Sequence, residues 1–460
     1  MEKALLFSIA AVYVAQQLTP LELTPLGGSL VFIFIAMQLP KLRGMTRWLT
    51  TGFAAIGAIL LAFQKATAWQ WFEAAGMNVT IVTLFLFAPL FGIPVRIPDY
   101  VASLKRFYQQ KLRSKTELFV GTQLLTQIMG VFINVGSIPV VYELVFVRPR
   151  QGMSRLLANA LNRGFAGAIL WSPYFAAMAL VTTALALPWS SVLPSLLGLA
   201  VLSLVVSWAV DVRELSLAET EPAEHEPAER EPAERESAAR DRNAAFPFGL
   251  AAYLAAAMIV VLALERAVEL PMAILICLAA VVFPLIWCVG KRALPVYRSG
   301  LKTHLTVTVP ALQKEMTLFL AAGFFSGAIG TTGFGAAVPA LLEHIPLLPI
   351  SFAFSLFAVA LIAGSSLIGL HPIVPVAILA SGIDPPAVGM SPTYFAVLLL
   401  GSWGLSNPIS PASAVNNLLA GLFQKPVLEL ASRNYRFAGW MAIALLIYVT
   451  AGSSIAGSGR

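Results

Sequence analysis

Charged residues are scarce in this chain of 460 residues. Asp, Glu, Lys and Arg make up 12% of it, against roughly a quarter of an ordinary soluble domain. The two cysteines, Cys277 and Cys288, lie in one apolar segment and lack the spacing of a disulfide framework or a zinc site. Phosphate-loop, His-Glu-x-x-His and Cys-x-x-Cys motifs are absent. The sequence therefore argues against a soluble globular protein and against an enzyme, and it predicts no bound metal or organic cofactor.

Apolar residues dominate instead, at 58% of the chain with a mean hydropathy of +0.80. A helix needs roughly 20 mostly apolar residues to cross a bilayer. Apolar runs predict about eleven crossing helices, near residues 3–17, 26–39, 47–64, 79–95, 157–181, 188–210, 247–264, 269–290, 315–340, 391–422 and 434–452. We therefore expect an all-α polytopic membrane protein.

Two further apolar stretches, 116–146 and 352–380, are too long for one crossing. Each has Gly and Pro near its middle, at Gly136-Ser137-Ile138-Pro139 and at Gly369-Leu370-His371-Pro372. Backbone that leaves a helix at membrane depth must be buried in protein or line a cavity, because lipid cannot satisfy its N–H and C=O groups. We predict that both stretches are re-entrant hairpins.

The positions of Lys and Arg predict the orientation. With the N-terminus in the cytoplasm, nearly all of the 30 Lys and Arg residues fall on the inner side, Arg163 and the arginines after residue 210 among them. Lys65, Arg266 and Arg460 fall outside. The net charge of +7 is thus explained by topology and does not indicate a nucleic-acid partner. We expect a multi-pass inner-membrane protein with its C-terminus outside.

A low-complexity segment divides the chain. Glu-Pro-Ala-Glu recurs at positions 221, 226 and 231, and such a composition cannot bury a core. We therefore predict a first half at 1–210, a disordered cytoplasmic linker at 211–245, and a second half at 246–460.

The two halves resemble each other in order and at a nearly constant shift of about 235 residues. The matches pair Thr83-Leu84-Phe85-Leu86 with Thr317-Leu318-Phe319-Leu320, Gly136 and Pro139 with Gly369 and Pro372, Gly164 and Gly167 with Gly401 and Gly404, and Ser172-Pro173 with Ser410-Pro411. Each half thus has a helix, a hairpin and a helix broken at Ser-Pro, over 157–181 and 391–422. An odd number of crossings separates the copies, which predicts an inverted-topology repeat with binding sites near the midplane.

The chain resembles the ion transporter superfamily, which includes divalent anion/sodium symporters, citrate and arsenite permeases and the large permeases of tripartite transporters. The resemblance covers about 79–422 and rests on the two opposed hairpins, each followed by a broken helix. Locally it rests on Pro372-Ile373-Val374-Pro375, Gly382-Ile383-Asp384-Pro385 and Ser406-Asn407-Pro408-Ile409-Ser410-Pro411. It implies an elevator mechanism in a homodimer. The Ser-Asn-Thr signature of dicarboxylate symporters is absent from both hairpin tips.

Candidate site residues lie at the tips and breaks, where small polar side chains, glycines and helix N-termini can bind a solute. The substrate-binding candidates are Asn134, Gly136, Ser137, Ser172, Pro173, Gly369, His371, Ser406, Asn407 and Ser410. Candidates for a coupling ion are Asn416, Asn417 and His371, the last of which can carry a proton. The alternative interpretation is that these residues shape the hairpins and hold helices together.

These patterns predict a secondary active transporter of a small solute, with an anion favoured, driven by sodium or protons. Within transport the alternative is an ion exchanger or metalloid exporter. The alternative from another class is a membrane enzyme or flippase acting on lipid-linked substrates. Expected partners are the lipid bilayer, the solute and a second copy of the chain.

Overall fold

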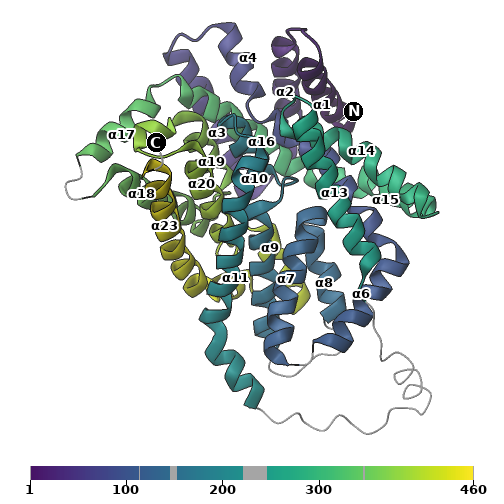
Figure 1. Cartoon of the computed structure of the whole chain (residues 1–460). Coiled ribbons are helices and arrows are strands. Elements are labelled where there is room, and N and C mark those ends of the chain that lie inside the picture. The colour runs from purple at the N-terminus through teal and green to yellow at the C-terminus, as the bar shows by residue number, and fades with distance from the viewer. Residues whose placement is uncertain (1, 113, 146–152, 221–245, 345–347, 459–460) are drawn as a thin grey trace, which may run out of the picture.

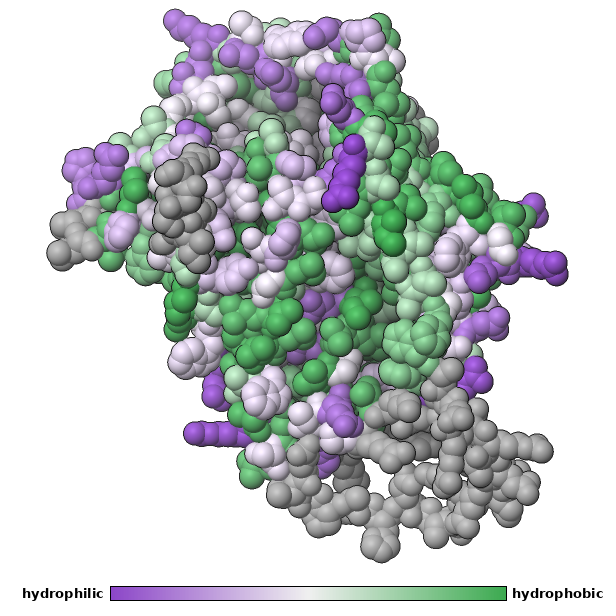
Figure 2. Space-filling view, viewed as in Figure 1, coloured by the Kyte–Doolittle hydropathy of each residue, from purple (hydrophilic) through white to green (hydrophobic). Residues whose placement is uncertain are grey.

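A computed structural model of the chain describes residues 2–112, 114–145, 153–220, 246–344 and 348–458. Every regular element in those ranges is a helix (Figure 1). Nine helices of the described residues are long and apolar enough to cross a membrane, or ten if one bent pair counts as a span. Large apolar side chains such as Trp48, Phe63 and Ile447 are exposed, and apolar residues cover wide areas of the face in Figure 2. The prediction of an all-α polytopic membrane protein is confirmed.

The first half has eleven described helices. They are α1 (Glu2–Leu18), α2 (Thr24–Gln38), α3 (Gly44–Phe63), α4 (Ala68–Gly76), α5 (Val79–Phe87), α6 (Pro98–Lys111), α7 (Lys115–Ile133), α8 (Ser137–Val145), α9 (Ser154–Trp171), α10 (Ala176–Ala184) and α11 (Trp189–Thr220), with short 3-10 turns at Leu39–Lys41, Ala88–Gly92 (η2), Pro94–Arg96 and Asn134–Gly136.

The second half begins with α13 (Phe248–Ala267), α14 (Met272–Gly290) and α15 (Leu294–Thr303). It continues with the π-helical turn η5 (His304–Thr308), α16 (Val309–Gly330), α17 (Phe334–Glu343), α18 (Ile350–Leu367), α19 (Ile373–Gly382), a 3-10 turn at Pro385–Val388, α20 (Pro392–Ser406), α21 (Ala414–Phe423), α22 (Val427–Ser432) and α23 (Tyr435–Ser458).

The sequence repeat corresponds to a repeat of elements. The hairpin helices α7 and α8 of the first half match α18 and α19, and the broken pair α9 and α10 matches α20 and α21. The repeated glycines have a packing role, because a Cβ on Gly164 would lie 2.4 Å from the Gln123 carbonyl oxygen and one on Gly401 would lie 2.5 Å from Leu445. Glycine at these positions allows the helices to approach closely.

Local signals set the ends of the repeated helices. Ser114 and Glu117 form a capping box at the start of α7, with Ser114 Oγ accepting from the Glu117 N–H at 3.0 Å. Ser391 caps α20 by accepting from the Tyr394 N–H, and Pro392 follows as the first helical residue. α7 folds back at Asn134, whose φ is +50°, and the chain between α18 and α19 turns at Gly369, whose φ is +87°.

Two groups of helices pack mainly among themselves. The hairpin bundle consists of α7–α11 and α18–α23, with α9 packed on α7, α11 and α20. The support bundle consists of α1–α5 and α13–α16, with α16 packed on α3, α4 and α5. α7, α8, α9 and α11 lie side by side in Figure 1. The bundles meet where α16 packs on α19 and where α10 packs on α5 and α14.

Two boundaries differ from the sequence-based expectation. α11 extends to Thr220, so the prediction of a disordered linker from residue 211 is wrong for 211–220; residues 221–245 lie outside the described residues. The expected crossing at 315–340 is bent by 69° between α16 and α17, at glycines 330 and 333. A Cβ on Gly335 would lie 2.1 Å from the Gly382 carbonyl oxygen, so this glycine segment both breaks a helix and allows close packing.

Candidate functional site

The first hairpin tip is fastened to the first helix break by one hydroxyl. Ser172, fully buried between α9 and α10, donates from Oγ to the Val131 carbonyl at 2.9 Å and accepts from the Tyr174 N–H at 3.2 Å. Val131 lies in the last turn of α7, directly before the tip. The break and the tip are therefore held as one unit.

The tip itself is closed by its own polar side chains. Ser137 Oγ donates to the Asn134 carbonyl at 2.8 Å, and Asn134 Oδ1 accepts from the Val135 N–H at 2.7 Å. Gly136 has an ordinary negative φ, and a Cβ added to it would meet nothing closer than 4.0 Å. The left-handed backbone of the first tip thus falls on Asn134, a residue type that tolerates it, and not on the glycine.

A small cavity of about 20 Å³ lies between this tip, the first break and α5. It is lined by Leu84, Phe85, Ala88, Pro89, Val131, Phe132, Asn134, Tyr174 and Ala176. This volume holds about one water molecule, so in this conformation the cavity is too small for a larger solute.

The second hairpin tip carries a histidine between aromatic rings. His371 lies edge-on to Phe319 of α16 and to Trp403 of α20, with ring centroids 5.0 and 5.6 Å apart. Its Nδ1 is 3.2 Å from the Ile373 N–H and accepts from it, at the start of α19. Gly369 faces the second break, since its Cβ position lies 3.8 Å from Ala412.

The second break is organised by Asn416 at the start of α21. Its Nδ2 donates to the carbonyls of Pro408 and Ser410 at 2.9 Å each, and lies 3.5 Å from that of Asn407. Asn407 Oδ1 in turn accepts from Ser413 Oγ at 3.0 Å. One buried amide thus donates to the carbonyls that have no intrahelical partner after α20 ends.

The predicted residues form two clusters. Asn134, Gly136, Ser137, Ser172 and Pro173 meet at the first tip and break, and Gly369, His371, Asn407, Ser410 and Asn416 gather at the second. Between them, α10 packs against α19 and α20. Two candidates are less central, because Ser406 Oγ bonds back to the Ser402 carbonyl within α20 and Asn417 is exposed.

Neutral groups make up both clusters: hydroxyls, amides, aromatic rings and helix termini. Within the described residues, no group of three or more His, Cys, Asp or Glu side chains could hold a metal ion. The helices α10 and α21, which begin at the breaks, have no side-chain cap. Their first N–H groups are available to a ligand, and the helix dipole favours a negative one.

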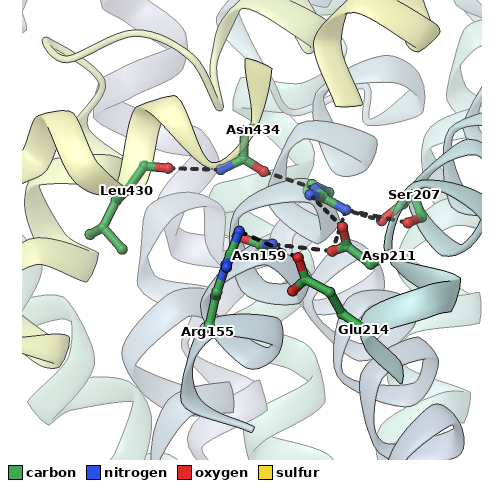
Figure 3. A network of polar contacts seen from close by, with 8 residues as sticks. Arg155, Asn159, Ser207, Asp211, Glu214, Leu430 and Asn434 are labelled. Atoms are coloured by element: carbon green, nitrogen blue, oxygen red, sulfur yellow. Dashed lines mark hydrogen bonds and ion pairs between the residues drawn. The ribbon is translucent and has the colours of Figure 1, made fainter. Parts of the chain in front are cut away.

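A buried ion pair beside the second cluster was missed by the sequence analysis. Arg163 of α9 is 0% exposed and pairs with Asp211 of α11 at 2.9 Å, while its Nε donates to Asn434 Oδ1 at 2.8 Å. Asn159 donates to the same Asp211 carboxylate at 3.1 Å, and Figure 3 shows how the network joins α9, α11 and the chain before α23. In the sequence, Arg163 is counted with the cytoplasmic cations, and the structure adds that its side chain is enclosed by protein and paired with Asp211. Its place inside a predicted crossing was the available signal.

The fold is similar to that of two solved transporters. The chain aligns with the Alcanivorax borkumensis YdaH transporter, whose structure is described as having an unusual topology, at a TM-score of 0.53 and 16% identity, covering 88% of this chain and 98% of that one. It aligns with Neisseria gonorrhoeae MtrF, described within a class of antimetabolite efflux pumps, at a TM-score of 0.51 and 14% identity, covering 87% and 94%. The likeness is one of fold. No family model and no curated protein matches the sequence.

Proposed function

We propose that this chain is a secondary active transporter that carries a small anionic solute by moving its hairpin bundle against its support bundle. The observation that carries the proposal is the pairing of each hairpin tip with a helix break: Ser172 joins the first pair, and Gly369 faces Ala412 in the second. Sites of this kind, between discontinuous helices, are where transporters bind solutes and ions. The likeness in fold to two transporters supports the same function.

Electrostatics favour an anion over a cation as the solute. Two helices begin at the breaks without a side-chain cap, namely α10 and α21. A helix N-terminus presents free N–H groups and the positive end of the dipole. With no carboxylate among the tip and break residues, a negative group on the solute would find donors and no repulsion.

Proton coupling has a specific candidate in His371. Its Nδ1 accepts the Ile373 N–H, and a proton on that nitrogen would remove the acceptor. Protonation would therefore release the first backbone donor of α19 at the tip. The sodium candidate Asn416 already uses both its side-chain oxygen and its side-chain nitrogen in hydrogen bonds to protein. Its oxygen is therefore less free to bind a sodium ion, and we favour proton coupling over sodium coupling.

The function is tested by flux in proteoliposomes under imposed proton or sodium gradients, with a panel of organic and inorganic anions and both directions of flux. Direction matters because one structural neighbour is described as an efflux pump. We expect gradient-driven flux of at least one anion, reduced in Ser172→Ala. The matched control is Ser29→Ala, whose hydroxyl bonds only to the Pro25 carbonyl in α2 of the support bundle. Chemical conversion of a lipid-linked substrate in detergent, without any gradient, would favour an enzyme instead.

A further inference from the structure

A carboxylate joins the two bundles beside the first break. The other hydrogen bonds that described residues make across this boundary link neutral groups, as between Ser326 of α16 and Ser381 of α19, whose hydroxyls lie 3.1 Å apart. Glu265 of α13, in the support bundle, differs. Its carboxylate accepts the backbone N–H of Trp189 at 2.6 Å and that of Ser190 at 3.1 Å, at the start of α11 in the hairpin bundle.

The start of α11 has no cap of its own. Pro188 precedes the helix and carries neither an N–H nor a polar side chain, while the Ser191 hydroxyl turns back to the Pro188 carbonyl. The first N–H groups of a helix lack intrahelical partners, and a carboxylate satisfies them well. Glu265 therefore acts as the cap of a helix in the other bundle.

The same contact reaches the first break. The fully buried indole of Trp189 donates to the carbonyl of Trp171, the last residue of α9 before the break, at 3.2 Å. After the break, the Tyr174 hydroxyl donates to the Ala257 carbonyl of α13 at 3.3 Å. One helix of the support bundle thus holds the first break from both sides, through Trp189 and directly through Tyr174.

We propose that Glu265 and the start of α11 form a latch that holds the hairpin bundle in the present conformation and opens in each transport cycle. This proposal rests on the proposed function. Charge-assisted bonds of 2.6 and 3.1 Å are directional and short-ranged, so sliding of the bundles breaks them. Weakening the latch shifts the conformational population toward other states, and closing it covalently stops the cycle.

The first experiment closes the latch. In a chain with Cys277 and Cys288 replaced by Ala, Glu265→Cys and Ser190→Cys are joined by a short, reducible bifunctional thiol reagent. A protease site is inserted within 221–245. After cleavage the two halves run separately on a gel, unless the crosslink between them has formed. Crosslinking should arrest flux and reductant should restore it. The control pair Lys3→Cys and Leu305→Cys joins α1 to η5 inside the support bundle, where Lys3 Nζ lies 3.0 Å from the Leu305 carbonyl, and should crosslink without effect on flux. Normal flux through fully crosslinked 190–265 protein would overturn the latch.

The second experiment needs no solute, so it separates failure of the latch from failure of the proposed function. A single cysteine at Ala176, which lines the small cavity, reports its opening by maleimide labelling. Glu265→Gln should label about fivefold faster than the parent, as loss of one helix-capping contact of about 1 kcal/mol predicts. Glu269→Gln, an exposed neighbour, should not change the rate, and a cysteine at buried Ala75 should stay protected in both variants. Equal labelling at position 176 in parent and Glu265→Gln would refute the latch, whether or not a solute is found.

Discussion

The side-chain amide of Asn162 donates to Asn416 Oδ1 across 2.7 Å, and so joins the first broken helix to the second. Asn162 is 1% and Asn416 0% exposed, and Asn416 Nδ2 also donates to the carbonyls of Pro408 and Ser410. The pair connects the two halves of the repeat at one buried point. Loss of this pair would destabilise the protein mainly because buried polar groups would be left without hydrogen-bond partners.

Asn416→Ala should destabilise the second break. The change leaves two carbonyls and the Asn162 amide without partners, and each unsatisfied buried polar group costs about 1–3 kcal/mol. We expect a lower midpoint of thermal unfolding in detergent and faster proteolysis at the break. Asn417→Ala is the matched control, because Asn417 is exposed and bonds within its own turn. Equal unfolding midpoints for the two variants would contradict the role given to Asn416.

Asn416→Asp tests whether a cation can replace the amide. The carboxylate would face the carbonyl oxygens that Nδ2 now contacts, so like partial charges would meet. We expect the unfolding midpoint of this variant to be lowered when the only cation in the buffer is a large organic one. Sodium or lithium should restore the midpoint, because these small cations can bind between oxygens. Wild-type protein should show no such dependence of its unfolding midpoint. A cation effect of equal size on the wild type would indicate that the break already binds the ion.

Loss of one partner should lower the free energy of unfolding more in the buried pair Arg163–Asp211 than in the half-exposed pair Arg155–Glu214. Arg163→Leu or Asp211→Leu alone leaves an uncompensated buried charge and should cost about 3–5 kcal/mol, whereas the double variant should recover much of that loss. Arg155→Leu removes a half-exposed pair with Glu214 and should cost about 1 kcal/mol or less. A double-mutant cycle of unfolding in detergent measures the coupling. Strict additivity of the two single changes would show that the pair is not energetically linked.

The repeat could be predicted from the sequence because its matches fall at positions with strong physical constraints. The glycines at 164 and 401 allow helices to touch, and Ser172 begins a break. The equivalence drawn between Gly136 and Gly369 fails at the level of the backbone, since the residue with positive φ in the first tip is Asn134. Sequence matching pairs residue types, whereas a turn requires only that some residue at the tip tolerate the left-handed region.

The Arg163 network and the Glu265 contact could not be predicted in the same way. Both depend on which helices lie side by side, and their partners are separated by 48 and 76 positions in the chain. Hydropathy places Asp211 at the end of a crossing, where a charge is normally solvated. Only the packing of α9 against α11 encloses it.

Two substitutions test the backbone of the tips. Gly369→Val should be strongly destabilising or inactive, because a β-branched residue is disfavoured at a φ of +87°. Gly136→Ala should be tolerated in folding and flux, since its Cβ position is open. Expression, monodispersity in detergent and flux are the measurements. Normal flux in Gly369→Val would remove the second tip from the mechanism.

His371→Gln separates hydrogen bonding from proton carriage at the second tip. Glutamine offers an amide oxygen that can accept the Ile373 N–H, as His371 Nδ1 does at 3.2 Å, but it does not titrate. If the ring carries a coupling proton, wild-type flux varies with external pH, whereas a side chain that does not titrate gives no such dependence. We therefore expect the flux of the variant to be reduced and nearly independent of pH. His344→Gln is the control, since His344 is exposed and bonds only to the Ala340 carbonyl. A variant that keeps the wild-type pH profile would exclude His371 as the proton carrier and leave it the structural role of holding α19 at the tip.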